Sequence, residues 1–394
     1  MTAATLQSPL LASDSPLDER QKSVVVRVSE AERAGILALP TDDPLDPKRR
    51  ARVEATRGEM FGQATAITAT WLRNETELSV VSDRLASGGF DRVFLVGAGD
   101  SLAVMIGARM ALELMLGLPC EPVQSLDFAY YQRHLVTDRS VVIALSSSGE
   151  TTRTVEALLV AQNVGALTIA LTNTVGSTLD VESENTLLIS ATRVGWPTQS
   201  SSAALALLLR LAAQTGVARG TAGAAELSAE LAQMPALIER VLEDNDAAIA
   251  AIARAEAQRT MFLFSAGGPS WAAAIIGAAK VKETSPDHAL EIQVEEYHHY
   301  NSQKPGEPLF VFAPTGPSVP RAVDTGRDAL RYGGQLYAIT TVGETAFTDI
   351  AATVIELPAV AEVLSPLLFV VPAQMIGYHV GMAKFAAAEA ELNA

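Results

Sequence analysis

The sequence contains a single cysteine, Cys120, and only five histidines. One cysteine cannot form a disulfide within the chain or a metal site built from several thiolates, so the cysteine content gives no sign of an oxidising compartment. We expect Cys120 to be a small buried hydrophobe. Because histidines are also scarce, we expect neither a bound metal nor a cofactor.

Positive charge is scarce as well. Lysine and arginine total 29 against 45 aspartates and glutamates, which gives a formal net charge of −16. A chain this acidic is a poor match for nucleic acid or for an anionic membrane surface, so we expect neither as a partner. A small anionic ligand is still compatible with this charge, because its pocket needs only a few local donors.

Long hydrophobic runs are missing, although 48% of the residues are apolar. The two most apolar stretches, 203–213 and 364–371, are shorter than the roughly 20 residues that span a bilayer, and they are broken or bounded by Arg210 and Pro372. Residues 1–47 lack the basic start and apolar core of a signal peptide. We therefore expect a flexible arm there, and a cytoplasmic protein.

A dense cluster of hydroxyl groups lies between a strand pattern and a helix pattern. Five apolar residues, 141–145, predict a buried strand, and the helix-prone run after residue 151 predicts a helix. Backbone N–H groups at a helix start lack partners and the helix dipole is positive there, so an anion fits. An N-cap with spare serines would give the same local pattern. The hydroxyls that can surround a phosphate belong to Ser146, Ser147, Ser148 and Thr151.

A second turn of this kind follows the predicted strand 93–96. Its Gly97-Ala98-Gly99 segment resembles the start of a dinucleotide-binding fingerprint, but that fingerprint needs a third glycine where this chain has Leu102. We therefore interpret the segment as another phosphate-facing turn, with Ser101 at the start of the following helix.

The sequence repeats itself at an offset of 168 residues, with residues 93–99 matching 261–267 and residues 170–172 matching 338–340. A duplicated domain is the simplest explanation. Strands alternate with helices in each copy, which predicts an α/β protein with two doubly wound parallel sheets in tandem. In the second copy, residues 313–318 have lost most of the serines and gained prolines. We therefore expect only the first copy to hold a phosphate.

These patterns divide the chain into four parts. They are a flexible arm (1–47), a first domain (48–220), a helical linker (221–258) and a second domain with C-terminal helices (259–394). The spacing of apolar residues predicts a helix over 48–73 that packs on the first domain. It also predicts a long helical stretch over 361–390, broken at Pro366 and Pro372.

Three motifs in this setting, residues 98–101, 145–151 and 281–283, resemble the SIS (sugar isomerase) family. The resemblance runs from about residue 59 to about residue 385. It is closest to the isomerase half of glucosamine-6-phosphate synthase and to fructosamine-6-phosphate deglycases. It implies two tandem flavodoxin-like SIS domains, a sugar phosphate as ligand, and a homodimer with a shared active site.

The resemblance also implies roles for individual residues. Gly99 and Thr198 match positions near the sugar. Glu283 matches the base that moves a proton between C1 and C2 of the open-chain sugar. His299 matches a histidine that helps to open the ring and that, in the synthase, comes from the neighbouring subunit. The hydroxyls that match the phosphate site are those of Ser101, Ser146, Ser148 and Thr151, with Ser147 at a position where the synthase has glutamine.

Without the resemblance, two of these residues have simpler interpretations. Glu283 lies among charged neighbours and would be an exposed charge at a helix end. His299 lies in an acidic run with a second histidine, residues 295–300, that suggests metal ligands, although adjacent histidines point apart on a helix. We keep the absence of a metal as the expectation.

The resemblance implies an enzyme of phosphosugar and amino-sugar metabolism. Two reactions begin with the C1/C2 proton transfer: isomerisation of an aldose or amino-sugar phosphate, and hydrolytic release of an amine from a fructosamine phosphate. We expect no glutamine amidotransferase activity, because the arm before Lys48 is too short for a glutaminase domain. The last lysine is Lys384, so the synthase's imine-forming tail lysine has no match, which favours amine release. A non-catalytic sugar-phosphate sensor is a third interpretation.

Overall fold

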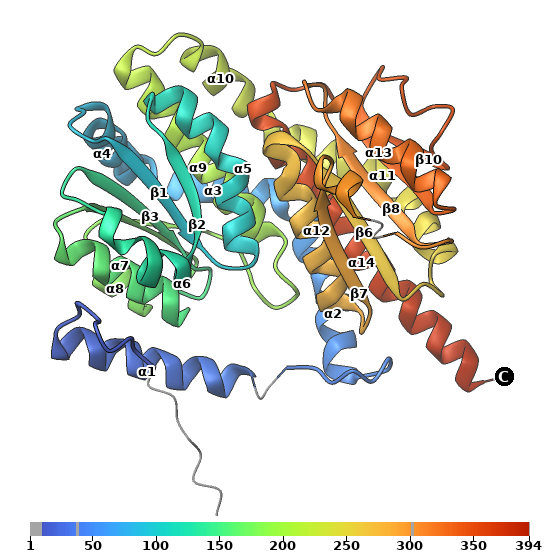
Figure 1. The fold of residues 1–394 in the computed structure, drawn as a ribbon, viewed down its shortest axis with the longest axis horizontal. Coiled ribbons are helices and arrows are strands. Elements are labelled where there is room, and N and C mark those ends of the chain that lie inside the picture. The colour runs from blue at the N-terminus through green and yellow to red at the C-terminus, as the bar shows by residue number, and fades with distance from the viewer. Residues whose placement is uncertain (1–9, 37–38, 301–302, 394) are drawn as a thin grey trace, which may run out of the picture.

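The computed structural model describes residues 10–36, 39–300 and 303–393. Two lobes each contain a five-stranded parallel sheet covered by helices (Figure 1). In the first sheet the strand order is β2-β1-β3-β4-β5. Its strands are β1 (Arg92–Gly97), β2 (Cys120–Gln124), β3 (Ser140–Leu145), β4 (Leu167–Thr172) and β5 (Thr186–Leu188).

The second sheet repeats this order as β7-β6-β8-β9-β10. The matching segments 93–99 and 261–267 begin on β1 and β6, the second strand of each order. The predicted fold class is therefore confirmed, with two doubly wound parallel sheets in one chain. The strands are β6 (Met261–Ala266), β7 (His288–Gln293), β8 (Pro308–Ala313), β9 (Gln335–Thr341) and β10 (Thr353–Leu357).

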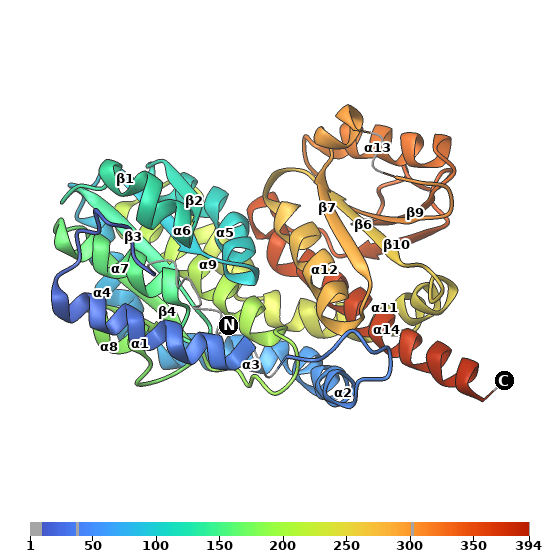
Figure 2. The same cartoon turned by 60° about the horizontal axis from the view of Figure 1, so that its bottom comes forward.

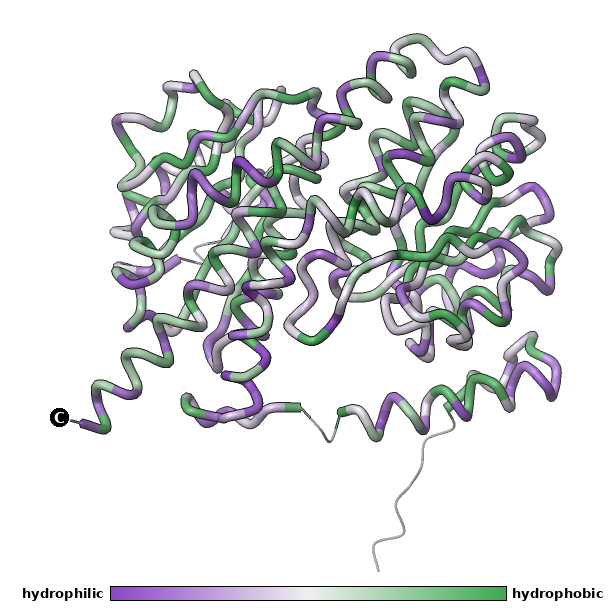
Figure 3. The backbone as a smooth tube through the Cα atoms, turned by 180° about the vertical axis from the view of Figure 1, so that it is seen from behind, coloured by the Kyte–Doolittle hydropathy of each residue, from purple (hydrophilic) through white to green (hydrophobic). Residues whose placement is uncertain are grey.

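Helices cover both faces of each sheet, so the central strands are buried and apolar, as in β3, where every residue is buried. Figure 3 colours the strands of the first sheet mostly as hydrophobic. The first lobe has α4 (Glu75–Ala86), α5 (Asp100–Leu116), α6 (Ser125–Asp127), α7 (Thr152–Asn163), α8 (Thr178–Glu182) and α9 (Gln199–Arg219). The linker and the second lobe have α10 (Ala224–Leu231), α11 (Met234–Ala255), α12 (Trp271–Thr284), α13 (Val319–Arg331) and α14 (Ser365–Leu392).

The helix predicted over 48–73 is present as two helices. They are α2 (Pro47–Phe61) and α3 (Gln63–Arg73), separated at Gly62. Asp46 caps α2, because its carboxylate accepts hydrogen bonds from the backbone N–H groups of Lys48 and Arg49.

Residues 1–47 were expected to form a flexible arm, but part of this segment is helical. The structure has α1 (Glu19–Ile36) along the outside of the first lobe, beside α7 and α8 (Figures 1 and 2). Val25 and Val28 of α1 are buried and belong to the same apolar cluster as Leu158 of α7. The polar residues around this helix masked its narrow apolar face in the sequence. Residues 1–9 lie outside the described part of the chain.

Among the residues that the structure describes, two helices, α9 and α14, are long and apolar enough to cross a membrane by length and composition alone. The apolar stretches expected from the sequence, 203–213 and 364–371, are shorter than these two helices. The predicted break at Pro372 is wrong, because Pro372 lies inside α14. In both helices most of the apolar stretch is buried within the protein, 78% in α9 and 94% in α14. Packing on all sides explains why α14 continues through a residue that cannot donate a backbone hydrogen bond.

Close packing between α12 and α14 depends on two glycines. A Cβ added at Gly377 would lie 2.3 Å from the Cβ of Lys280, and one added at Gly381 would lie 2.8 Å from the Cβ of Thr284. These glycines therefore let the backbones of the two helices approach at the end of α12 that carries Lys280 and Glu283.

We expect Gly377→Ala to destabilise the protein by about 1–3 kcal/mol, because the new methyl group meets Lys280 in a packed contact. The matched control is Gly58→Ala in α2, where an added Cβ has nothing within 4 Å. That change should be neutral or stabilising by up to about 1 kcal/mol. Thermal unfolding of both variants measures the difference, and equal melting temperatures would contradict the close packing.

Candidate active site

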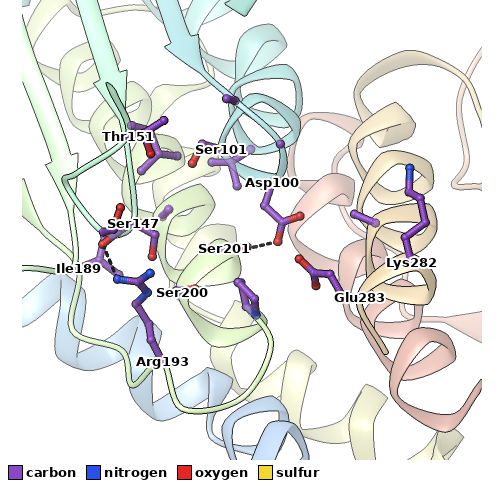
Figure 4. Close-up of a pocket in the computed structure, with 18 residues that line it drawn as sticks. Asp100, Ser101, Ser147, Thr151, Ile189, Arg193, Ser200, Ser201, Lys282 and Glu283 are labelled. Atoms are coloured by element: carbon purple, nitrogen blue, oxygen red, sulfur yellow. Dashed lines mark hydrogen bonds between the residues drawn. The ribbon is translucent and has the colours of Figure 1, made fainter. Parts of the chain in front are cut away.

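A cavity of about 420 Å³ lies where the two lobes meet. Residues at or beside the N-termini of α5, α7 and α9 line it from the first lobe, and the C-terminal end of α12 closes it from the second (Figure 4). Three helix dipoles therefore direct their positive ends towards one space, which favours an anion there. Parallel sheets bind ligands beyond the carboxyl ends of their strands, where the turns after β1 and β3 lie.

The turn between β3 and α7 forms a cup of hydroxyl groups. Ser146 Oγ lies 2.9 Å from Thr151 Oγ1 and 3.3 Å from Ser148 Oγ. Gly149 has a φ of +68°, and an added Cβ would lie 1.9 Å from Ser177 Oγ. Only glycine fits at this position, because both the backbone angle and the nearby hydroxyl exclude a side chain.

Most of the predicted phosphate residues meet in this one cavity. Ser101 lines it from the turn after β1, together with Gly99, which was predicted near the sugar. Ser147, Ser148 and Thr151 line it from the cup. Ser146, which is buried, lies behind them and orients two of their hydroxyls.

Thr198, expected near the sugar, is not on the cavity wall. It is buried, and its hydroxyl has no hydrogen-bond partner among the described residues. Its neighbours Pro197, Ser200 and Ser201 line the cavity instead. The position matched from the sequence is therefore one or more residues away from the side chains that reach the space.

Glu283 lies in the same cavity as the hydroxyl cup, although it comes from the other lobe. Its side chain is 25% exposed, and its Oε2 atom lies 2.5 Å from Lys280 Nζ. The same ammonium group lies 2.7 Å from Asp100 Oδ2 of α5. Glu283 is therefore a partly buried, paired carboxylate, which contradicts its interpretation as a simple exposed helix-end charge.

Burial dominates the electrostatics of Glu283. It raises the pKa of the carboxyl group, and the nearby Asp100 carboxylate raises it further. Lys280 and Arg52 act in the opposite direction, and the result is a pKa of about 7. A carboxyl group with this pKa can accept or donate a proton near neutral pH.

Lys280 remains charged despite complete burial. Burial alone would lower the pKa of its ammonium group, but Asp100 and Glu283 more than offset this, so the pKa is raised. Sequence reasoning missed Lys280 and Asp100 as site residues. The signal was present, since Lys280 precedes Glu283 by three residues and therefore shares its helix face.

His299 does not line this cavity in its own chain. It lies in the 3-10 turn Glu296–His299 after β7, and its side chain is 60% exposed. The adjacent His298 points the other way, with Nδ1 2.8 Å from Asp328 Oδ2 and Nε2 3.1 Å from Thr325 Oγ1. Within the described residues no cluster of His, Cys, Asp or Glu is arranged to hold a metal ion.

Arg193 is a further cavity residue that the sequence did not suggest. Its guanidinium donates a hydrogen bond to the backbone oxygen of Ser147 at 3.2 Å, so it adds positive charge beside the cup (Figure 4). Arg193 lies on the irregular segment between β5 and α9, where no periodic pattern indicates its direction.

The equivalent position in the second lobe is occupied by a carboxylate. A Cβ added at Gly316, in the turn after β8, would lie 2.6 Å from Glu362 Oε1, and one at Gly268, after β6, would lie 3.5 Å from the same atom. Burial raises the pKa of Glu362. A negative side chain between these two turns opposes a phosphate there, in agreement with the proline-rich sequence.

The sequence profile of the SIS domain matches residues 90–213. Glutamine–fructose-6-phosphate aminotransferase (isomerizing) of Thermus thermophilus is 31% identical over 299 residues, which is 74% of this chain and 49% of that protein. The enzyme of the same name from Thermococcus kodakarensis is 28% identical over 82% of this chain and 54% of its own length. The chain thus spans about half the length of these relatives.

Solved structures of similar fold cover most of the chain. The C-terminal domain of glucosamine-fructose-6-phosphate aminotransferase from Francisella tularensis has a TM-score of 0.74 at 21% identity, covering 83% of this chain and 95% of that one. Glucosamine-6-phosphate deaminase from Thermotoga maritima has a TM-score of 0.65, also at 21% identity, with coverage of 83% and 94%. At this identity the likeness concerns the fold.

The raised pKa of Glu283 predicts a pH dependence of stability. The folded protein holds this proton up to a pH of about 7, whereas the unfolded chain releases it near its ordinary value of 4.5. Stability therefore falls as pH rises through this range, by on the order of 1–3 kcal/mol. Glu283→Gln cannot ionise and should lose less stability between pH 5 and pH 8. Urea unfolding of both proteins tests this, and parallel curves would contradict it.

Proposed function

We propose that this chain, whose residues 90–213 match the SIS domain, is an enzyme that moves a proton between C1 and C2 of a sugar phosphate. One observation supports this above all others. A hydroxyl cup suited to a phosphate and a carboxyl group with a pKa of about 7 line the same cavity, although they come from different lobes.

The phosphate binds at the cup and the sugar extends towards the second lobe. Ser101, Ser148 and Thr151 donate to phosphate oxygens, and Arg193 adds a charge beside them. With the phosphate on C6 held there, C1 and C2 lie at the opposite end of the open chain, beside Glu283. The substrate is held in one orientation because its phosphate contacts the hydroxyl cup, whereas its C1 and C2 atoms lie beside Glu283.

Glu283 transfers the proton. As a carboxylate it removes a proton from the carbon next to the carbonyl group; the C–H electron pair forms a C=C bond, and the carbonyl π pair moves to its oxygen, which gives an enediolate. A proton then passes from the neighbouring hydroxyl group to this oxygen. The protonated carboxyl group returns its proton to the former carbonyl carbon as the new carbonyl forms, which regenerates the base. A pKa near 7 serves both steps, because neither direction of transfer is strongly uphill at neutral pH.

We place the acid at the ring oxygen, or at the leaving amine, on His299 of a second copy. The exposure of His299 in its own chain is compatible with this role, because a side chain buried within its own subunit could not reach the active site of a second subunit. A homodimer with shared sites follows from this proposal. We favour a cytoplasmic enzyme of amino-sugar phosphate metabolism.

Two reactions fit this site: isomerisation of an aldose or amino-sugar phosphate, and amine release from a fructosamine 6-phosphate. Both begin with the same proton transfer. The names of similar proteins include an aminotransferase that isomerises and a deaminase, which supports either reaction. A sensor that binds a phosphosugar without turnover is the alternative outside enzymology.

Proton exchange in D₂O distinguishes these alternatives. We expect the protein to exchange hydrogen at C1 or C2 of glucosamine 6-phosphate or of fructoselysine 6-phosphate, followed by NMR. Glu283→Gln should lower the exchange rate by about 10²- to 10⁴-fold while retaining phosphosugar binding. Binding without exchange in the unmodified protein would support the sensor, and the absence of both would refute the proposal.

The cup can be tested by two adjacent serines. Ser148→Ala should weaken binding of sorbitol 6-phosphate, which cannot react, by about 10- to 100-fold, because a hydrogen bond to a charged group is lost. Ser147→Ala should have a smaller effect, because the Ser147 hydroxyl already donates to Asn173 Oδ1 at 2.9 Å. Calorimetry with sorbitol as the phosphate-free control measures both, and equal losses would argue against the assigned cup.

A further inference from the structure

Asp100 connects the two lobes at the base of the cavity. It is the first residue of α5, so its charge also suits the positive end of that helix. Its Oδ2 atom lies 2.7 Å from Lys280 Nζ, on α12 of the other lobe, and accepts a hydrogen bond from Ser201 Oγ at 3.1 Å. Figure 4 shows its carboxylate directed towards Glu283.

Lys280 is shared by two carboxylates. Its side chain is 1% exposed, and its ammonium group lies 2.7 Å from Asp100 and 2.5 Å from Glu283. A buried ammonium group with a single carboxylate partner would pair with that carboxylate alone. Here Lys280 pairs with both Asp100 and Glu283, so Glu283 is held in place while its charge is only partly compensated.

We propose that Asp100 is a positioning residue for Glu283, acting through the shared Lys280 across the interface between the lobes. Asp100 anchors the lysine from the first lobe, and the lysine anchors Glu283 at the cavity wall. The Asp100 charge also limits how strongly Lys280 favours the ionised form of Glu283. The role of Glu283 as the base rests on the proposed function, whereas the three-residue arrangement does not.

Other charges around Glu283 are engaged elsewhere. Arg52 of α2 acts on Glu283 through space, but its guanidinium stacks 3.7 Å from the ring centre of Trp196. Lys282 on α12 points to Glu291 of β7, at 3.6 Å.

Beyond the end of α12, Lys384 of α14 pairs with Asp287 at 2.9 Å. On α9, the neutral Ser201 donates a hydrogen bond to Asp100. Within the described residues, Asp100 is therefore the one carboxylate besides Glu283 that forms an ion pair with Lys280.

Titration of the Glu283 carboxyl group in substrate-free protein tests this inference without relying on turnover. The signal is followed by NMR in protein labelled with ¹³C-glutamate and identified by its loss in Glu283→Gln. In Asp100→Asn we expect the titration midpoint to fall by about one pH unit, a tenfold change in the acid constant, because a repelling charge is lost and Lys280 pairs with Glu283 alone. Ser201→Ala keeps the Asp100 charge and should leave the midpoint within about 0.3 pH units of the unmodified protein.

Two further variants keep the test decisive if Asp100→Asn does not fold. Lys280→Met should raise the midpoint, because the two carboxylates then face each other without a cation. The double variant Asp100→Asn/Lys280→Met leaves neither member of that pair charged, and its midpoint should lie between those of the single variants. An unchanged midpoint in Asp100→Asn, or in the double variant relative to Lys280→Met, would overturn the inference.

The same shift should be visible in catalysis. If the protein exchanges substrate protons as proposed, the pH below which the rate falls should move down in Asp100→Asn together with the NMR midpoint. A purely structural defect would lower the rate at every pH and leave unchanged the pH below which the rate falls. If the unmodified protein shows no proton exchange, the proposed function is refuted. The NMR titration still decides the role of Asp100.

Discussion

One buried ammonium group, that of Lys280, links the architecture of this protein to its chemistry. A lysine this deeply buried is stable only with compensating charges, and here one comes from each lobe. The packing of α12 against α5 and α14 is therefore tied to the site. If the lobes moved apart, the protein would expose a charged cluster and lose the arrangement that raises the pKa of Glu283.

The duplicated fold explains why the site is asymmetric. Both lobes have the same strand order, so both place two turns at the carboxyl edge of the sheet. In the first lobe these turns present hydroxyls and helix N-termini to an open cavity. In the second lobe, the carboxyl group of Glu362 lies beside Gly268 and Gly316 of the equivalent turns, and the lobe contributes the end of α12 to the cavity instead. One copy thus carries the hydroxyl cup, and the other carries the carboxyl group with the raised pKa.

What could be predicted from the sequence depends on the range of each physical signal. The hydroxyl cup was predictable because a strand, a turn and a helix start are consecutive in the chain. The repeat was predictable because buried strands keep their apolar pattern. The break predicted at Pro372 was wrong, because α14 is stabilised by packing against other parts of the protein, which the local sequence does not show. The helix α1 was missed because its apolar face is narrow and its flanks are polar.

By itself, the sequence determined the α/β class, the duplication and the hydroxyl cup, because these depend on patterns of residues that are neighbours in the chain or that recur along it. It also identified Glu283 as a candidate base, through the match to a known family. Only the tertiary structure decided that Asp100, Lys280 and Glu283 meet, that Arg193 faces the cup, and that Thr198 and His299 lie off the cavity of their own chain. These are contacts between segments up to about 180 residues apart. They depend on how helices pack across the two lobes, and periodicity along one element carries no information about that packing.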